Sequence, residues 1–215
     1  MAAPGPSLLG AVGSIVASGL PVIVVNDAWR ALPNADVLYA VDNAWWIHHR
    51  GVPAFKGERW AAHESLARAQ HGNDKSEIAE RYGLYCVLGC AHSDGFSFDP
   101  FRIAYGSNSG FQAINLAILF GCERIALCGF DMHGTSHFFG DHPDAIMGVD
   151  TQRKRDFSRF VKYFDAAART LPAHIQIINV TPGSTLRCFP IMSLEDGLAN
   201  CRLHRDRTLA HAAAG

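Results

Sequence analysis

The sequence predicts a single α/β domain, a Rossmann-like three-layer sandwich built around a mostly parallel sheet. Short β-branched runs alternate along the chain with helical segments, which is typical of parallel strands joined by crossover helices. With 48% hydrophobic and 18% charged residues over 215 positions, the chain can bury one core, and a disordered protein is excluded. We expect this domain to span residues 1–203. Residues 204–215 lack a core pattern, and we expect them to form a disordered tail.

The expected strands are short apolar runs bounded by turn residues, too short for buried helices. They lie at Leu20–Val25, Asp36–Val41, Arg124–Cys128 and Ile175–Val180.

Three segments are expected to be helical. Ser109–Phe120 places apolar residues on one face and is followed by Gly121, a suitable helix cap. Asp156–Leu171 has a phenylalanine-rich stripe opposite charged residues. The stretch Glu58–Arg81 is polar, and we expect it to form exposed helix.

Polar residues follow each expected strand at the point where it ends. Because ligands of open parallel sheets bind beyond the carboxyl ends of the strands, we expect Asn26, Asp42, Ser109 and Asp131 to line one cleft. Asparagine, aspartate and glycine also form turns and caps, which is the alternative.

A glycine-containing loop at residues 105–110 leads directly into the helix expected at Ser109. Backbone N–H groups at such a helix start hold anions, so we expect Asn108, Ser109 and Gly110 to contact a phosphate-containing ligand. Plain capping by one of these residues is the alternative. Pro4–Leu8 is a weaker form of the same pattern.

A histidine-rich loop follows the strand expected at Arg124–Cys128. Such a loop can bind a divalent metal, for which Asp131, His133 and His137 are the candidate ligands, or supply a general base. A solvated polar loop is the third interpretation, and the spacing matches no closed zinc site. The chemically active side chains in this loop are Asp131, His133, His137, Asp141 and His142.

Composition excludes several classes of protein. The net charge of −1 is not that of a protein held mainly by nucleic-acid phosphates. No apolar stretch approaches the roughly 20 residues that a membrane span needs, and no basic segment precedes an apolar one as in a secretory signal. The six cysteines lie in contexts that fit reduced core thiols, so we expect a cytoplasmic protein.

Six motifs, in this order and spacing, resemble a family known mostly from phage and bacterial genomes. It groups with the 6-hydroxymethylpterin diphosphokinase-like proteins and, more remotely, with bacterial sialyltransferases that use CMP-sialic acid. The motifs are G-P-S-L from Gly5, V-V-N-D from Val24, D-V-L-Y-A-V-D from Asp36, G-S-N-S-G-F-Q-A-I-N-L-A from Gly106, C-G-F-D-M from Cys128 and H-F-F-G-D-H-P from His137.

The resemblance implies a nucleotide site and a catalytic histidine. It places Gly5, Ser7, Asn26 and either Asp42 or Asn43 around the nucleotide. It places Asn108, Ser109 and Gly110 near the donor phosphate or sugar. It assigns the base to His142, preceded by His137. In the mechanism that we expect, Asp131 either holds a divalent ion or orients a histidine.

The expected function is therefore nucleotide-dependent transfer to a hydroxyl acceptor, a small molecule or a glycan. The donor is a CMP-sugar, or ATP with Mg²⁺ if a diphosphoryl group is transferred. The alternative is a non-catalytic, phage-associated nucleotide-binding or morphogenesis protein that keeps the fold. A homo-oligomer is compatible with the sequence.

Overall fold

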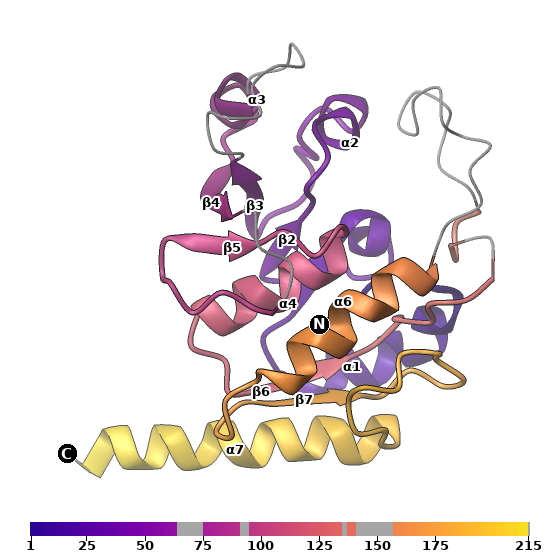
Figure 1. Ribbon diagram of the computed structural model, residues 1–215, viewed down its shortest axis with the longest axis vertical. Coiled ribbons are helices and arrows are strands. Elements are labelled where there is room, and N and C mark those ends of the chain that lie inside the picture. Colours follow the sequence, from indigo (N-terminus) through magenta and orange to yellow (C-terminus); the bar gives the residue numbers. More distant parts are fainter. Residues whose placement is uncertain (64–74, 91–94, 135–136, 141–156, 215) are drawn as a thin grey trace.

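The computed structural model describes residues 1–63, 75–90, 95–134, 137–140 and 157–214. Its centre is an all-parallel sheet with the strand order β1-β2-β3-β4-β5, and β6 and β7 form a second parallel pair (Figure 1). Helices flank the sheet, so the α/β class and the Rossmann-like architecture predicted from the sequence are confirmed. The strands are β1 (Ile23–Val25), β2 (Val37–Tyr39), β3 (Glu58–His63), β4 (Tyr85–Cys90), β5 (Arg102–Ala104), β6 (Arg124–Leu127) and β7 (Gln176–Asn179).

The first three residues join the two groups of strands into one sheet. Ala2 forms parallel bridges with both Val24 of β1 and Cys128 beside β6. Its N–H donates to Ile23 O at 2.9 Å, and the Ala3 N–H donates to Cys128 O at 2.8 Å. The continuous order is therefore β7-β6, residues 1–3, then β1 to β5. This puts the Pro4–Leu8 turn at the carboxyl edge, in the middle of the sheet.

The four expected strands are present, but three more were missed. β3 lies where we expected polar helix, so the helical expectation for Glu58–His63 is wrong, and β4 and β5 lie where we expected no strand. The reason is tertiary. β3 pairs on both sides, with β2 and β4, and buries only Ala61 and Ala62, while its first residues remain partly solvent-accessible.

The helix α4 crosses one face of the sheet as its central packing element, with ten of its residues buried. Its two buried amide side chains both form hydrogen bonds that connect α4 to neighbouring segments. Gln112 accepts from the Tyr39 hydroxyl of β2 and donates to Tyr105 O, and Asn115 Oδ1 accepts from the N–H groups of Ser97 and Ala104. The helical elements are η1 (Pro6–Ala11), α1 (Val12–Ser18), η2 (Asn26–Arg30), α2 (Asn43–His48), α3 (Lys75–Tyr82), α4 (Ser109–Leu119), α6 (Phe157–Arg169) and α7 (Leu194–Ala214).

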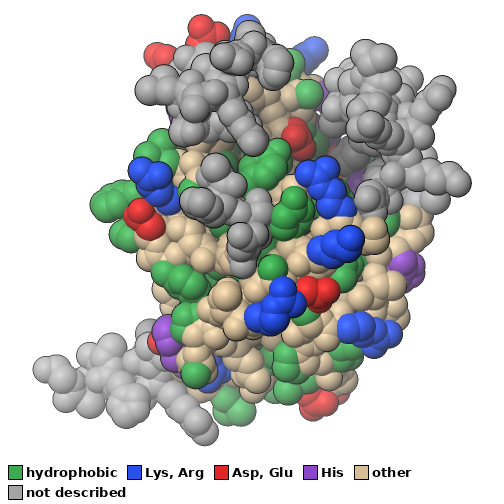
Figure 2. Space-filling view, viewed as in Figure 1, with side chains coloured by type: hydrophobic (Ala, Val, Ile, Leu, Met, Phe, Trp, Pro, Cys, Tyr) green, Lys and Arg blue, Asp and Glu red, His purple; other side chains and the backbone are tan. Residues whose placement is uncertain are grey.

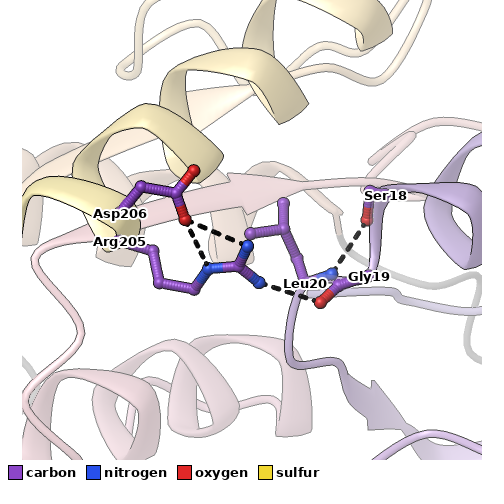
Figure 3. Close-up of polar contacts among 5 residues, drawn as sticks. All are labelled: Ser18, Gly19, Leu20, Arg205 and Asp206. Carbon is purple, nitrogen blue, oxygen red and sulfur yellow. Dashed lines mark hydrogen bonds and ion pairs between the residues drawn. The ribbon is translucent and has the colours of Figure 1, made fainter. Parts of the chain in front are cut away.

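The helix α7 runs through Ala214, so the disordered tail expected from residue 204 is not what the structure shows. The Arg205 guanidinium donates to Gly19 O at 3.0 Å, at the end of α1, and also to Asp206 (Figure 3). His204 Nε2 lies 3.2 Å from Glu123 Oε2. Alanine, leucine and arginine favour helix strongly, and these contacts fix the helix against the sheet.

No helix in the described part of the chain is both long and apolar enough to cross a membrane. The six cysteines are free thiols. Cys128 and Cys201 are buried as expected, but Cys86 and Cys122 are exposed, so the expectation of core thiols is wrong for these two.

Candidate functional site at the carboxyl edge of the sheet

The loops that follow the strands gather at one edge, as parallel topology requires (Figure 1). Asn26 follows β1, Asp42 follows β2, Ser109 opens α4 after β5, and Asp131 follows β6. One contact shows two of these exits meeting directly: the Val41 N–H donates to Ser109 Oγ at 3.2 Å.

The turn at Gly5–Ser7 is fixed by Asp131. Both the N–H and the hydroxyl of Ser7 donate to the Asp131 carboxylate, at 3.3 and 2.9 Å, and Asp131 is buried. A Cβ on Gly5 would lie 1.9 Å from Asp131 Oδ2, so only glycine allows this approach. The structure thus gives Asp131 a turn-holding role that sequence analysis did not foresee.

The loop before α4 is held from within. Asn108 Oδ1 accepts from the Phe111 N–H at 2.8 Å, which is the capping contact, and Asn108 Nδ2 donates to Gly106 O at 3.0 Å. Gly106 and Ser107 have left-handed φ values of 50° and 59°. A Cβ on Gly110 would lie 3.0 Å from Phe130, so this glycine packs against the core.

A basic side chain approaches this loop from α6. Arg159 Nη2 donates to Ser107 Oγ at 3.3 Å. Lys and Arg side chains gather over the α6 side of the molecule in Figure 2. The predicted site residues include no cation, so Arg159 supplies a charge that the sequence motifs did not indicate.

Asn26 combines two unusual features. Its φ is 46°, a left-handed conformation that asparagine tolerates better than most residues. Its Oδ1 atom is buried, and in the described part of the chain it has no hydrogen-bond partner. Such an atom in a native fold calls for a ligand or an ordered water.

Asp42 is exposed at the start of α2, and its charge affects the pKa of the buried Tyr39. Burial raises the pKa of Tyr39 well above its usual value, and the negative charge of Asp42 adds to that rise. Tyr39 therefore stays protonated and donates to Gln112.

The histidine-rich loop lies only partly within the described residues. His137 stacks on Phe139, with ring centroids 5.0 Å apart, and the Phe138 N–H donates to Pro4 O at 3.1 Å. His133 is exposed. In the described parts of the chain no three or more metal-binding side chains are grouped, so Asp131, His133 and His137 form no such set. His142 and Asp141 lie outside the described residues.

Sequence analysis missed a charged cluster beside Asn26. Asp27 is 1% exposed and accepts from the Trp45 indole N–H at 2.7 Å. Arg30 and His49 approach the same carboxylate. The signal was present, because Asp27 follows Asn26 at a strand exit and two tryptophans and two histidines follow the next strand.

Comparisons with protein families, with curated proteins and with solved structures find no match for this chain.

Proposed function

We propose that the protein is a nucleotide-dependent transferase, of the glycosyl or diphosphoryl type, acting on a hydroxyl acceptor at the carboxyl edge of the sheet. The observation that carries this proposal is the Oδ1 of Asn26 at the exit of β1, which is buried and has no hydrogen-bond partner among the described residues. A carboxamide oxygen there suits an exocyclic amine of a nucleobase or a sugar hydroxyl as donor.

The charges around Asn26 suit an anionic ligand. The α4 start has the positive end of a helix dipole, with Ser107 and Arg159 beside it. Arg30, four residues after Asn26, reaches over the ring of Phe139, at 5.6 Å, and its side chain is 51% exposed. The positive charges of Arg30 and Arg159 would both attract a donor phosphate to this edge of the sheet.

The proposed chemistry follows from this arrangement. Asn26 and the Gly5–Ser7 turn bind the nucleotide, and the α4 start with Arg159 stabilises negative charge on the leaving phosphate. A nearby histidine takes the proton of the acceptor hydroxyl. Transfer from ATP would add Mg²⁺ bound to the phosphates, whereas a CMP leaving group needs no metal.

Melting temperatures with CMP, CDP, ATP and GTP, each with and without Mg²⁺, test the proposal. A nucleotide at about 100 times its Kd adds about 2.7 kcal/mol to the free energy of unfolding. Asn26→Gly keeps the left-handed backbone and removes the carboxamide, so we expect it to fold normally and to bind at least tenfold more weakly.

The outcomes distinguish a transferase from a non-catalytic protein with the same fold. A Tm that no nucleotide changes contradicts the proposal. A nucleotide that binds but is not turned over favours the non-catalytic alternative.

A further inference from the structure

The cluster around Asp27 contains a histidine placed for proton transfer. His49 Nε2 lies 3.3 Å from Asp27 Oδ1, at ion-pair distance though not in an aligned hydrogen bond, and the His49 side chain is 16% exposed. The other oxygen of Asp27 accepts from the Trp45 indole N–H. A carboxylate that is 2% exposed therefore faces Nε2 of the imidazole, and Nδ1 is the ring nitrogen on the side away from that contact.

Aromatic packing restricts the imidazole. The His49 ring contacts Trp45 at 4.4 Å and Trp29, edge to face, at 6.4 Å between centroids. His48 meets it from the other side at 4.9 Å. A ring held by three neighbours loses little entropy on reaching a reactive geometry.

The backbone after His49 is strained. Arg50, Gly51 and Val52 all have left-handed φ values, of 50°, 71° and 52°. A β-branched valine rarely adopts this conformation, and such strain persists only where surrounding contacts impose it. The Val52 N–H donates to His49 O at 2.9 Å, so the strained turn fixes the residue that carries the imidazole.

The cluster is connected to the site. Asp27 follows Asn26 directly, and Arg30, 3.7 Å from Asp27 Oδ1, reaches Phe139 in the loop that hydrogen-bonds to Pro4. Of the four buried side-chain polar atoms without a hydrogen bond in the described residues, three belong to this region: Asn26 Oδ1, Trp29 Nε1 and His49 Nε2.

We propose that His49, positioned by Asp27, is the proton acceptor of this site; the inference rests on the transferase function proposed above. The acceptor O–H bond breaks and its proton moves to His49 Nδ1. The acceptor oxygen bonds to the transferred carbon or phosphorus, and the bond from that atom to the leaving phosphate breaks with its electron pair. Asp27 stabilises the imidazolium that results.

Variants of matched shape test this role. His49→Gln can still place an N–H group against Asp27 but cannot take a proton, whereas His174→Gln makes the same change at an exposed histidine before β7, at the amino edge, and serves as the control. The readout is CMP release from CMP-sialic acid and AMP release from ATP, with glycerol as the hydroxyl acceptor. We expect His49→Gln to lower turnover by about 10²–10⁴-fold with nucleotide affinity within a few-fold, and His174→Gln to leave both unchanged.

Asp27→Asn provides a second test. Among the described residues, the Asp27 carboxylate lies 3.3 Å from His49 Nε2, Arg30 approaches Asp27, and His48 contacts the imidazole. Removing the Asp27 charge takes away a negative charge that stabilises the imidazolium. The lower limb of the pH–rate profile should therefore move to lower pH, with wild-type melting behaviour used to confirm folding.

The two proposals fail in different ways. If wild-type protein neither binds nor turns over a nucleotide, the proposed function and this inference both fall. If it turns one over and folded His49→Gln does so at the wild-type rate, only the role of His49 is overturned. An unmoved pH–rate limb in folded Asp27→Asn overturns the positioning role of Asp27.

Discussion

At the carboxyl edge of the sheet the loops are held by short polar contacts, whereas at the amino edge the strands begin beside an apolar hollow. Three of the non-glycine residues with left-handed φ, Asn26, Ser107 and Met132, directly follow or approach strand exits at the carboxyl edge. The amino edge instead has a cavity of about 470 Å³, lined by apolar residues such as Leu20 and Leu198.

The difference shows where this fold tolerates change. A left-handed or close-packed backbone costs free energy unless its surroundings fix it, and it is found mostly where function needs a defined shape. The apolar cavity at the amino edge does not depend on a backbone conformation that its surroundings must fix. Substitutions at the carboxyl edge should therefore destabilise the protein more than comparable ones at the amino edge.

The largest effect is expected at Gly5. Gly5→Ala places a Cβ within 2.4 Å of Gly129 O as well as against Asp131, and backbone cannot move aside as a flexible side chain does. We expect a loss of about 3 kcal/mol in the free energy of unfolding, measured by urea denaturation, together with loss of nucleotide binding.

Gly13→Ala is the matched control. A Cβ at Gly13 in α1 would meet nothing within 4 Å, so this variant should be stabilised by about 0.5–1 kcal/mol through helix propensity. Equal effects at the two glycines would contradict the role given to the close packing around Gly5.

The sequence predicts the position of the polar residues that follow the strands better than it predicts the strands in the rest of the sheet. Asn26, Asp42 and Asp131 could be placed at one edge because each follows an apolar run, and parallel strands end at the same edge. Ser109 was placed there through the glycine-containing loop that leads into its helix, because the strand before it was missed. β3 has no such pattern: Glu58–His63 begins with charged residues and becomes a strand only through pairing on both sides. The pairing of Ala2 with both Val24 and Cys128 could not be predicted either, because a segment of three residues is too short to show a strand periodicity.

Side-chain roles were harder to predict than positions. Ser7, Ser109 and Asp131 were expected to face a ligand, yet each makes a contact within the protein. A sequence shows which polar residues follow a strand but not which of them pair with one another. Asp27 and His49 were missed for the same reason, because they meet only through the packing of α2 on η2.

A second prediction uses Cys128, which lines the amino-edge cavity. Burial raises the pKa of this thiol to about 11 from a usual value near 9. The folded state favours the neutral thiol, so its stabilising effect is present below pH 9 and is lost as the pH rises toward 11. At about 1.4 kcal/mol per pH unit, the wild type should lose up to about 3 kcal/mol more than Cys128→Ala between pH 9 and 11.

Urea denaturation of both proteins at pH 8, 9, 10 and 11 measures this difference. Tyr39 also has a raised pKa, so the wild-type curve alone does not isolate the thiol. Parallel curves for the two proteins would show that Cys128 does not contribute.

The smallest effect is expected at Arg205, which fastens α7 to the amino edge (Figure 3). Its guanidinium donates to Gly19 O, but the side chain is 38% exposed and its carboxylate partner Asp206 is 55% exposed. Solvent screens such a contact, so Arg205→Ala should lower the free energy of unfolding by only about 0.5 kcal/mol, measured by thermal melting. Amide hydrogen exchange adds a local readout, because a weakened attachment should speed exchange in α7 and leave α4 unchanged. A loss above about 2 kcal/mol would mean that the amino edge depends on specific polar contacts as strongly as the carboxyl edge does.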